Sequence, residues 1–146
     1  MKTIAISACL LGKNCRYNGE IKEDKALLSL LEDAKLIPFC PEDFCYGTPR
    51  PSMDLRQGER LDAYSNATGA NLAPPLRAYA EAFFHTYSEI DLLIGKDRSP
   101  SCGVGSAKCY DEAKNLLSQE ADGVMIQEAK AKGITTIGAE AFKCNA

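Results

Sequence analysis

Short apolar segments alternate along this chain with segments of helical periodicity, and this alternation constrains the fold more than any other feature. Four segments predict buried strands because they are short and apolar on both sides: 3–8, 35–39, 90–94 and 134–138. Helices between successive strands return the chain to the same end of the sheet through right-handed crossovers. The strands are therefore expected to lie parallel, with helices covering both faces of the sheet.

Three helices are predicted between these strands. The first is indicated by apolar residues at helical spacing: Leu27, Leu30, Leu31 and Ala34. The second starts near Pro74 and Pro75, since proline fits the first turn of a helix, and it carries one apolar stripe, Leu76, Tyr79, Ala80, Phe83, Phe84 and Tyr87. The last has Asp122 as its predicted N-cap and Gly133 as its stop.

The segment 45–71 fits this alternation least well, because glycine and proline interrupt it repeatedly. We interpret it as a long excursion over the functional site rather than as a second domain. The sequence thus predicts an α/β protein: a single-domain, Rossmann-like three-layer fold over residues 1–146 with a short, mostly parallel sheet.

Composition excludes several classes of function. The formal net charge of −3 argues against a nucleic-acid partner, which requires a basic face. No apolar run is long enough to cross a bilayer, and the chain does not begin with a basic and then apolar secretory segment. We expect a cytoplasmic protein with neither a nucleic-acid nor a membrane partner.

Seven cysteines in 146 residues require an explanation. This density lies below the roughly 8–10% typical of disulfide scaffolds. The count is odd, and cytoplasmic thiols are normally reduced. Metal or thiolate chemistry is therefore favoured over crosslinks.

Cysteines follow three of the predicted strands directly. Cys9 follows segment 3–8 with Cys15 close behind, Cys40 follows segment 35–39, and Cys102 lies in the loop after segment 90–94. Ligands of open parallel sheets bind at the carboxyl ends of the strands, so these thiolates are expected to converge. Soft thiolate ligands favour an iron–sulfur cluster or a soft metal.

Polar residues accompany the cysteines in each of these segments. Glu42, two residues after Cys40, is the best candidate for a general acid or base in the chain, although a solvated loop glutamate is an equally simple reading. Arg50, held between two prolines, is suited to position a substrate oxygen or a neighbouring carboxylate. Arg16 lies beside Cys15, and its positive charge stabilises a thiolate.

The segment 96–103 is the richest in polar groups. Ser99 and Ser101 bring hydroxyls beside Cys102, and Gly103 allows the backbone to approach a bulky ligand. Lys96 and Arg98 add positive charge that suits an anionic cluster. The single histidine, His85, lies off the apolar stripe of its helix, so a Ser-His-Asp hydrolase is poorly supported.

The other three cysteines, Cys45, Cys109 and Cys144, are interpreted as non-ligands, with Cys45 the first exception to consider. A structural zinc site in an unrelated fold is a further alternative for the cysteines as a group.

Taken together, these motifs resemble a bacterial family formerly catalogued only as a domain of unknown function, whose characterised members are thiouracil desulfidases. The resemblance is carried by Ser7–Gly12, Cys15–Tyr17, Gly19, Lys22, Cys40–Glu42, Pro49–Pro51 and Arg98–Gly103. It implies a [4Fe-4S] cluster held by three protein ligands, Cys9, Cys15 and Cys102, with one open iron and with Cys40 as a further ligand candidate. It also implies that Glu42 and Ser101 assist catalysis.

The resemblance implies non-redox desulfuration of a small thiolated heterocycle such as thiouracil, releasing sulfide and the oxo product. Arg50, Ser99 and Gly103 are the expected substrate-binding residues, and the substrate is a free thiobase, a thionucleoside or another thioamide. Cluster-assembly proteins are expected partners. The alternative is a non-catalytic module that carries or senses a cluster or metal, which leaves Glu42 and Ser101 without a purpose.

Overall fold

The computed structural model describes residues 1–21 and 23–145. Strands and helices alternate as predicted over most of the chain. Lys22, one of the motif residues quoted above, lies outside the described residues. No helix in the described part of the chain is long and apolar enough to cross a membrane.

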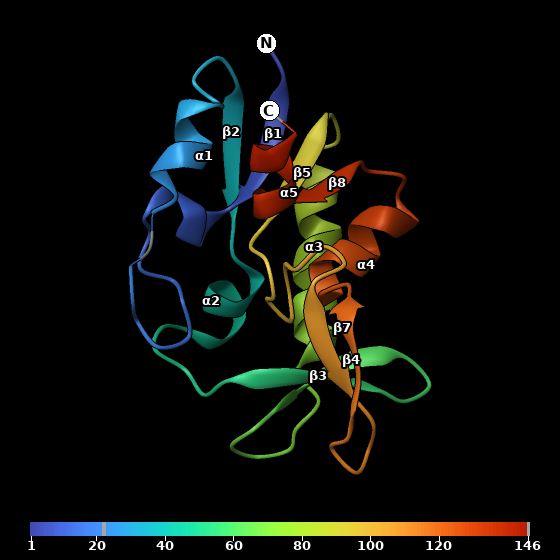
Figure 1. Cartoon of the computed structure of the whole chain (residues 1–146). Helices are drawn as coiled ribbons and strands as arrows, with labels where there is room; N and C mark the ends of the chain where they lie inside the picture. The colour runs from blue at the N-terminus through green and yellow to red at the C-terminus, as the bar shows by residue number, and fades with distance from the viewer. Residues whose placement is uncertain (22, 146) are drawn as a thin grey trace.

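Four strands form an all-parallel sheet in the order β2-β1-β5-β8: Lys35–Phe39, Thr3–Ser7, Leu92–Gly95 and Thr136–Gly138. These strands correspond to the four predicted segments, and in Figure 1 they occupy the upper half of the molecule, near both chain ends. Helices cover this sheet on both faces, so the predicted α/β class and layered arrangement are confirmed.

One face of the parallel sheet packs on α3 (Ala73–Thr86) and α4 (Val124–Ala131). The other face packs on α1 (Lys25–Ser29) and α5 (Ala139–Cys144), where Leu27 is fully buried. The Asp24 side chain accepts a hydrogen bond from the Leu27 N–H and so caps α1. These two cores place the sheet between two helical layers.

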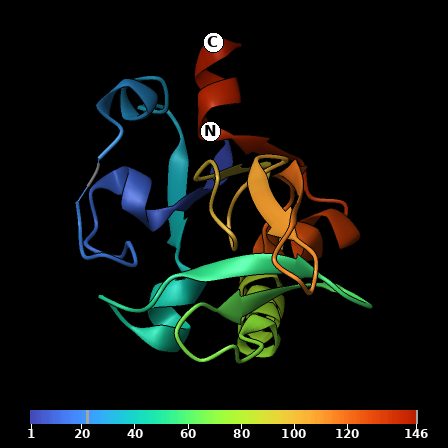
Figure 2. The ribbon, with the colours of Figure 1, turned by 60° about the horizontal axis from the view of Figure 1, so that its bottom comes forward.

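A second four-stranded sheet was not predicted. Its order is β4-β3-β6-β7, formed by Leu61–Ser65, Met53–Gln57, Ala107–Tyr110 and Leu116–Ala121. Two antiparallel hairpins are joined by the parallel pair β3–β6. Figure 2 shows β3 crossing beneath the parallel sheet, with α5 at the opposite end of the molecule. The segment interpreted as an excursion is therefore largely the β3–β4 hairpin.

Helix α3 serves both sheets. Near its start Ala73 and Leu76 pack against the second sheet, and further along Ala80, Phe83 and Phe84 pack against the parallel sheet. The apolar stripe read from the sequence is thus divided between two cores, which explains its length.

Arg77, on the same helix, ties the second sheet to α4. Its guanidinium donates to Asp62 Oδ1 at 2.8 Å, to the Leu61 carbonyl at 2.9 Å and to Glu128 Oε1 at 3.0 Å. The residue is only 9% exposed, so these are largely buried ion pairs.

The start of α4 differs from the prediction. Gly123, rather than Asp122, occupies the N-cap position and makes no side-chain cap. The Asp122 carboxylate instead accepts hydrogen bonds from the Gly105 N–H and the Lys130 ammonium, both at 2.8 Å. A Cβ at Gly123 would overlap the backbone of Ser101 and Cys102, so glycine allows α4 to begin directly beneath that loop.

Candidate active site

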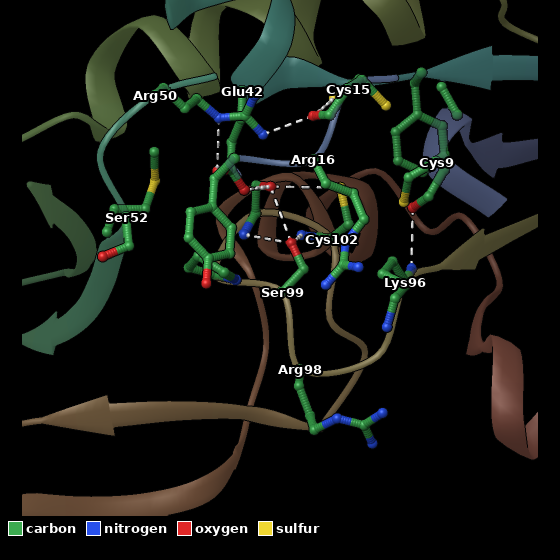
Figure 3. Close-up of a pocket in the computed structure, with 18 of the residues that line it drawn as sticks. Cys9, Cys15, Arg16, Glu42, Arg50, Ser52, Lys96, Arg98, Ser99 and Cys102 are labelled. Carbon is green, nitrogen blue, oxygen red and sulfur yellow. Dashed lines mark hydrogen bonds and ion pairs between the residues drawn. The ribbon is translucent and has the colours of Figure 1, made fainter. Parts of the chain in front are cut away.

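The carboxyl ends of β1, β2 and β5 open into one cavity of about 410 Å³. The chain after β1 supplies a 3₁₀ helix (Ala8–Leu11) and the loop that follows it, the chain after β2 supplies α2 (Pro41–Tyr46), and the chain after β5 supplies the segment 96–102. Its lining includes Ser7, Cys9, Cys15, Arg16, Tyr17, Cys40, Glu42, Arg50, Ser52, Met53, Lys96, Asp97, Arg98, Ser99, Ser101 and Cys102. The structure therefore brings the three predicted cysteine segments together (Figure 3).

The four cysteines of the cavity fall into a group of three and a single residue. The Cys15 thiol is hydrogen-bonded with Cys9 and with Cys40, whereas Cys102 lies beside Ser101. The hydrogen bond with Cys15 lowers the pKa of Cys9 to about 7, and the charges of Lys96 and Arg16 act in the same direction against burial. A hydrogen bond with Cys15 also lowers the pKa of Cys40. Thiolates, the form that binds metals, are thus favoured at two positions.

The remaining two cavity thiols are held in their protonated form in the absence of a ligand. Hydrogen bonds with Cys40 and Cys9 raise the pKa of Cys15, and burial raises that of Cys102. A bound metal or cluster displaces such protons, because its charge stabilises the thiolate directly.

Glu42 is a buried carboxylate, not a solvated loop residue. It is 7% exposed and lies in the first turn of α2, where Pro41 is the first helical residue. Its Oε2 accepts a hydrogen bond of 2.5 Å from the Ser101 hydroxyl. Its Oε1 lies 3.4 Å from Nε of Arg50. A buried carboxylate with an adjacent hydroxyl is an arrangement suited to moving protons.

The loop that carries Ser101 and Cys102 is held by its own backbone and by α4. The Ser99 hydroxyl oxygen accepts hydrogen bonds from the N–H groups of Ser101 and Cys102, at 3.3 and 3.0 Å. The N–H groups of Val124 and Met125, in the first turn of α4, donate to the carbonyls of Pro100 and Ser101. These hydrogen bonds tie the loop that carries Ser101 and Cys102 to the start of α4.

Comparison with known proteins identifies the family. A sequence model described as 2-thiouracil desulfurase matches residues 4–141.

The chain belongs to the 2-thiouracil desulfurase family.

Two relatives accompany this match. An uncharacterised protein of Bacillus subtilis (strain 168), YbbK, is 30% identical over 111 residues, which are 70% of this chain and 74% of YbbK. The solved structure of the [4Fe-4S]-dependent thiouracil desulfidase TudS is 28% identical and covers 96% of this chain and 92% of its own, with a TM-score of 0.73. The resemblance inferred from the cysteine motifs is thereby confirmed.

The cysteines of this 2-thiouracil desulfurase family member offer several thiol ligands at one cavity. Among the described residues, no three Cys, His, Asp or Glu side chains surround one common point at metal-binding distance. A structural zinc site requires such a closed set. The ligands of a cluster bind different irons and need not surround one point, and four cysteines line this one cavity.

Positive charge surrounds these thiols. Arg16 is paired with Glu20 at 3.2 Å, and Arg98 is paired with Glu140 at 3.1 Å and points away from the labelled cysteines in Figure 3. Lys96 is half-buried at the cavity, and burial lowers its pKa. Lys96 and Arg16 are the cations whose charges act on Cys9, whereas the charge of Arg98 is paired with Glu140.

Two of the predicted substrate-binding residues are engaged by the protein itself. Gly103 is buried, is absent from the described lining of the cavity, and packs against the Ser99 backbone, where a Cβ would lie 2.8 Å from the Ser99 carbonyl oxygen. The Arg50 side chain is only 5% exposed and contacts Glu42 and the backbone of Cys15. Ser99 lines the cavity directly.

Tyr79 is a site residue that the sequence did not reveal. The sequence assigns it to the apolar stripe of α3, but its hydroxyl accepts a hydrogen bond of 3.1 Å from the Cys40 N–H. Burial raises the pKa of Tyr79 to about 12, so the hydroxyl stays neutral. A tyrosine on a core-facing helix position carries a polar group that needs a partner, and this was the available signal.

The three cysteines interpreted as non-ligands lie apart from the cavity lining. Cys109 is buried in the core of the second sheet, and Cys45 packs at its margin. Cys144 is exposed at the end of α5.

Proposed function

We propose that this chain removes sulfur from a small thiolated heterocycle such as thiouracil by non-redox hydrolysis that depends on a [4Fe-4S] cluster. The observation that carries the proposal is one cavity in which four cysteines meet the buried Glu42–Ser101 pair, in a chain of the 2-thiouracil desulfurase family. The relation to TudS, a [4Fe-4S]-dependent thiouracil desulfidase, supports both the cluster and the reaction.

In this proposal Cys9, Cys15 and Cys102 would hold the cluster, and Cys40 is the further candidate at the same cavity. A cluster held by three protein ligands would supply an open Lewis-acid position suited to a thiocarbonyl sulfur.

The protein's own side chains would manage water and protons. Glu42 Oε2 accepts a proton from the attacking water and later returns it to the departing group. The Ser101 hydroxyl, which donates to that oxygen at 2.5 Å, holds the carboxylate in place and lies 3.5 Å from Cys102 Sγ. Overall, the carbon–sulfur double bond is replaced by a carbon–oxygen double bond, and the two hydrogens of water leave with sulfur as hydrogen sulfide. No electrons are transferred.

The cavity volume suits a small ring rather than a polymer, since pockets for small molecules span about 300–1,000 Å³. Ser99, in the loop that carries Ser101 and Cys102, is the proposed substrate contact. Ser52 and Met53, at the start of β3, line the same cavity. A free thiobase, a thionucleoside and another small thioamide all belong to the proposed substrate class.

The test is purification without oxygen, reconstitution with iron and sulfide, and measurement of sulfide released from thiouracil beside an iron and labile-sulfide count. About four irons per chain together with turnover supports the proposal. A full cluster without turnover of any thiolated heterocycle contradicts it and favours a cluster carrier or sensor. Absence of iron after reconstitution removes the cluster from the proposal altogether.

A further inference from the structure

The guanidinium of Arg50 is almost completely occupied by other parts of the protein. Of its five N–H donors, Nε faces Glu42 Oε1, Nη1 donates to the Gly47 carbonyl at 2.8 Å and to Thr48 Oγ1 at 2.9 Å, and Nη2 donates to the Cys15 carbonyl at 2.8 Å. One donor is left. Arg50 borders the cavity, but its side chain is 5% exposed and has only this donor left to offer a substrate.

These contacts join two segments that carry different parts of the site. The loop after the 3₁₀ helix carries Cys15, and its carbonyl also lies 3.8 Å from Cys40 Sγ. The backbone N–H of Arg50 donates to the Tyr17 carbonyl at 2.8 Å, which anchors the same loop at a second point. Helix α2 carries Glu42. No other side chain among the described residues is recorded bonding to both Glu42 and Cys15.

Arg50 also decides which carboxylate oxygen of Glu42 meets Ser101. Because Oε1 is directed to Nε of Arg50, Oε2 is left for the Ser101 hydroxyl. Rotation of the carboxylate breaks one of these contacts. Orientation of this kind matters because small displacements of a reacting group reduce rates strongly.

We propose that Arg50 is a positioning residue that links the Cys15 loop to the Glu42 carboxylate, and that it does not bind substrate. The inference deepens the proposed function and rests on it for its kinetic arm, since Glu42 is the acid or base of that proposal. Lysine keeps the positive charge but lacks the planar fork, so it cannot hold these partners together.

The first experiment compares Arg50→Lys with Arg60→Lys, a matched control at an exposed site on the β3–β4 hairpin. Steady-state rates of sulfide release are expressed per reconstituted cluster. The expected result for Arg50→Lys is a kcat lower by about 10–100-fold with KM within about threefold, as for supporting residues of metal sites. Arg60→Lys is expected to match wild type. An increase in KM at unchanged kcat would assign Arg50 to substrate binding and overturn the proposal.

A double-variant cycle separates action through Glu42 from a general disturbance. Glu42→Asp shortens the side chain but keeps a carboxylate, so we expect it to retain measurable activity. If Arg50 acts through Glu42, adding Arg50→Lys to Glu42→Asp lowers kcat by no more than about threefold further, because coupled effects are not additive. Full multiplication of the two losses contradicts the proposed link.

A readout without turnover tests the other end of the link. In the full chain before reconstitution, Cys15 is buried and its loop is held by Arg50, so alkylation of Cys15, mapped by mass spectrometry, is slow. Loss of this charged hydrogen bond predicts at least about tenfold faster modification of Cys15 in Arg50→Lys. Cys109, buried in the second sheet, serves as the internal reference. Unchanged Cys15 protection overturns the inference even if the chain acts on no thiouracil.

Discussion

Each of the two sheets has a buried arginine side chain and a buried cysteine packed beside it, but the surroundings of those residues differ. At the carboxyl edge of the parallel sheet, Cys102 lies beside Ser101 and Glu42 in a polar cavity. In the second sheet, Cys109 packs among apolar side chains. Residue type alone therefore does not mark the site. The site is marked instead by residues at strand ends that have polar and charged neighbours.

The buried arginines show the same contrast. Arg50 makes three of its four guanidinium hydrogen bonds to neutral groups, and its ion pair with Glu42 is a long one of 3.4 Å. Arg77 is bound closely by two carboxylates, at 2.8 and 3.0 Å, and none of its partners lines the cavity. The first arrangement orients Glu42, the proposed acid or base, and the second ties α3 to the second sheet and to α4.

Replacement of cysteines gives the largest expected difference between the two regions. Cys9→Ser, Cys15→Ser and Cys102→Ser are each expected to reduce iron well below four per chain and to abolish sulfide release, because hydroxyls bind iron clusters poorly. Cys109→Ala should retain both. Iron analysis and a sulfide assay on the same samples test this prediction. Equal iron loss in Cys109→Ala would show that the cavity cysteines do not differ from Cys109 in holding the cluster.

Replacement of Glu42 should affect the reaction but not the cluster. Glu42→Gln keeps the shape of the side chain and removes its ability to exchange protons, so kcat is expected to fall by about 10²–10⁴-fold. Iron content should stay at the wild-type value. Glu59→Gln, on the exposed β3–β4 hairpin, is the matched control. Unchanged sulfide release from Glu42→Gln would falsify its proposed role.

Replacement of Arg77 should affect stability but not the reaction. Arg77→Met leaves Asp62 and Glu128 without their buried partner, which costs about 3–5 kcal/mol of unfolding free energy. Urea denaturation measures this loss against Arg60→Met, an exposed control. The kcat per cluster of the folded protein is expected to equal that of wild type, and a large fall in kcat would show that the second sheet takes part in catalysis.

Acid should weaken the second sheet through Asp62. Burial alone would raise the pKa of Asp62, but hydrogen bonds from Arg77 and Asn71 lower it below its usual value near 3.8. A carboxylate with a depressed pKa stabilises the fold above that usual value, and the contribution is lost as pH falls through the folded-state pKa. Denaturation midpoints measured between about pH 5 and 3 should therefore fall less steeply in Asp62→Asn than in wild type. Parallel curves for the two proteins would contradict this assignment.

Much of the parallel sheet could be predicted because its signals are local. Buried strands give short apolar runs, and cysteines placed directly after those runs are enough to imply a shared cavity. Burial of Glu42 could not be predicted, because it depends on a contact with Ser101, which is 59 residues away in the sequence.

The second sheet was hidden for a related reason. The β3–β4 hairpin pairs with the β6–β7 hairpin across a large sequence separation, with Leu55 opposite Cys109. Glycine and proline also obscure the strand pattern between residues 45 and 71. The predicted N-cap of α4 was wrong because a close contact with the backbone of Ser101 and Cys102 requires glycine at position 123. No local sequence pattern indicates such a contact. Tyr79 was missed because its side chain packs against the core of the parallel sheet, whereas its hydroxyl accepts a hydrogen bond from the Cys40 N–H.

Helix α3, which packs on both sheets, has a consequence for how this molecule comes apart. Leu76 and Phe83 lie two turns apart on one helix, the first in the core of the second sheet and the second in the core of the parallel sheet. Melting either core removes the helix that covers the other. We therefore expect denaturation to proceed as one cooperative transition, in which far-ultraviolet and aromatic signals coincide and neither sheet survives alone. We expect no proteolytic fragment that lacks one of the sheets to stay folded.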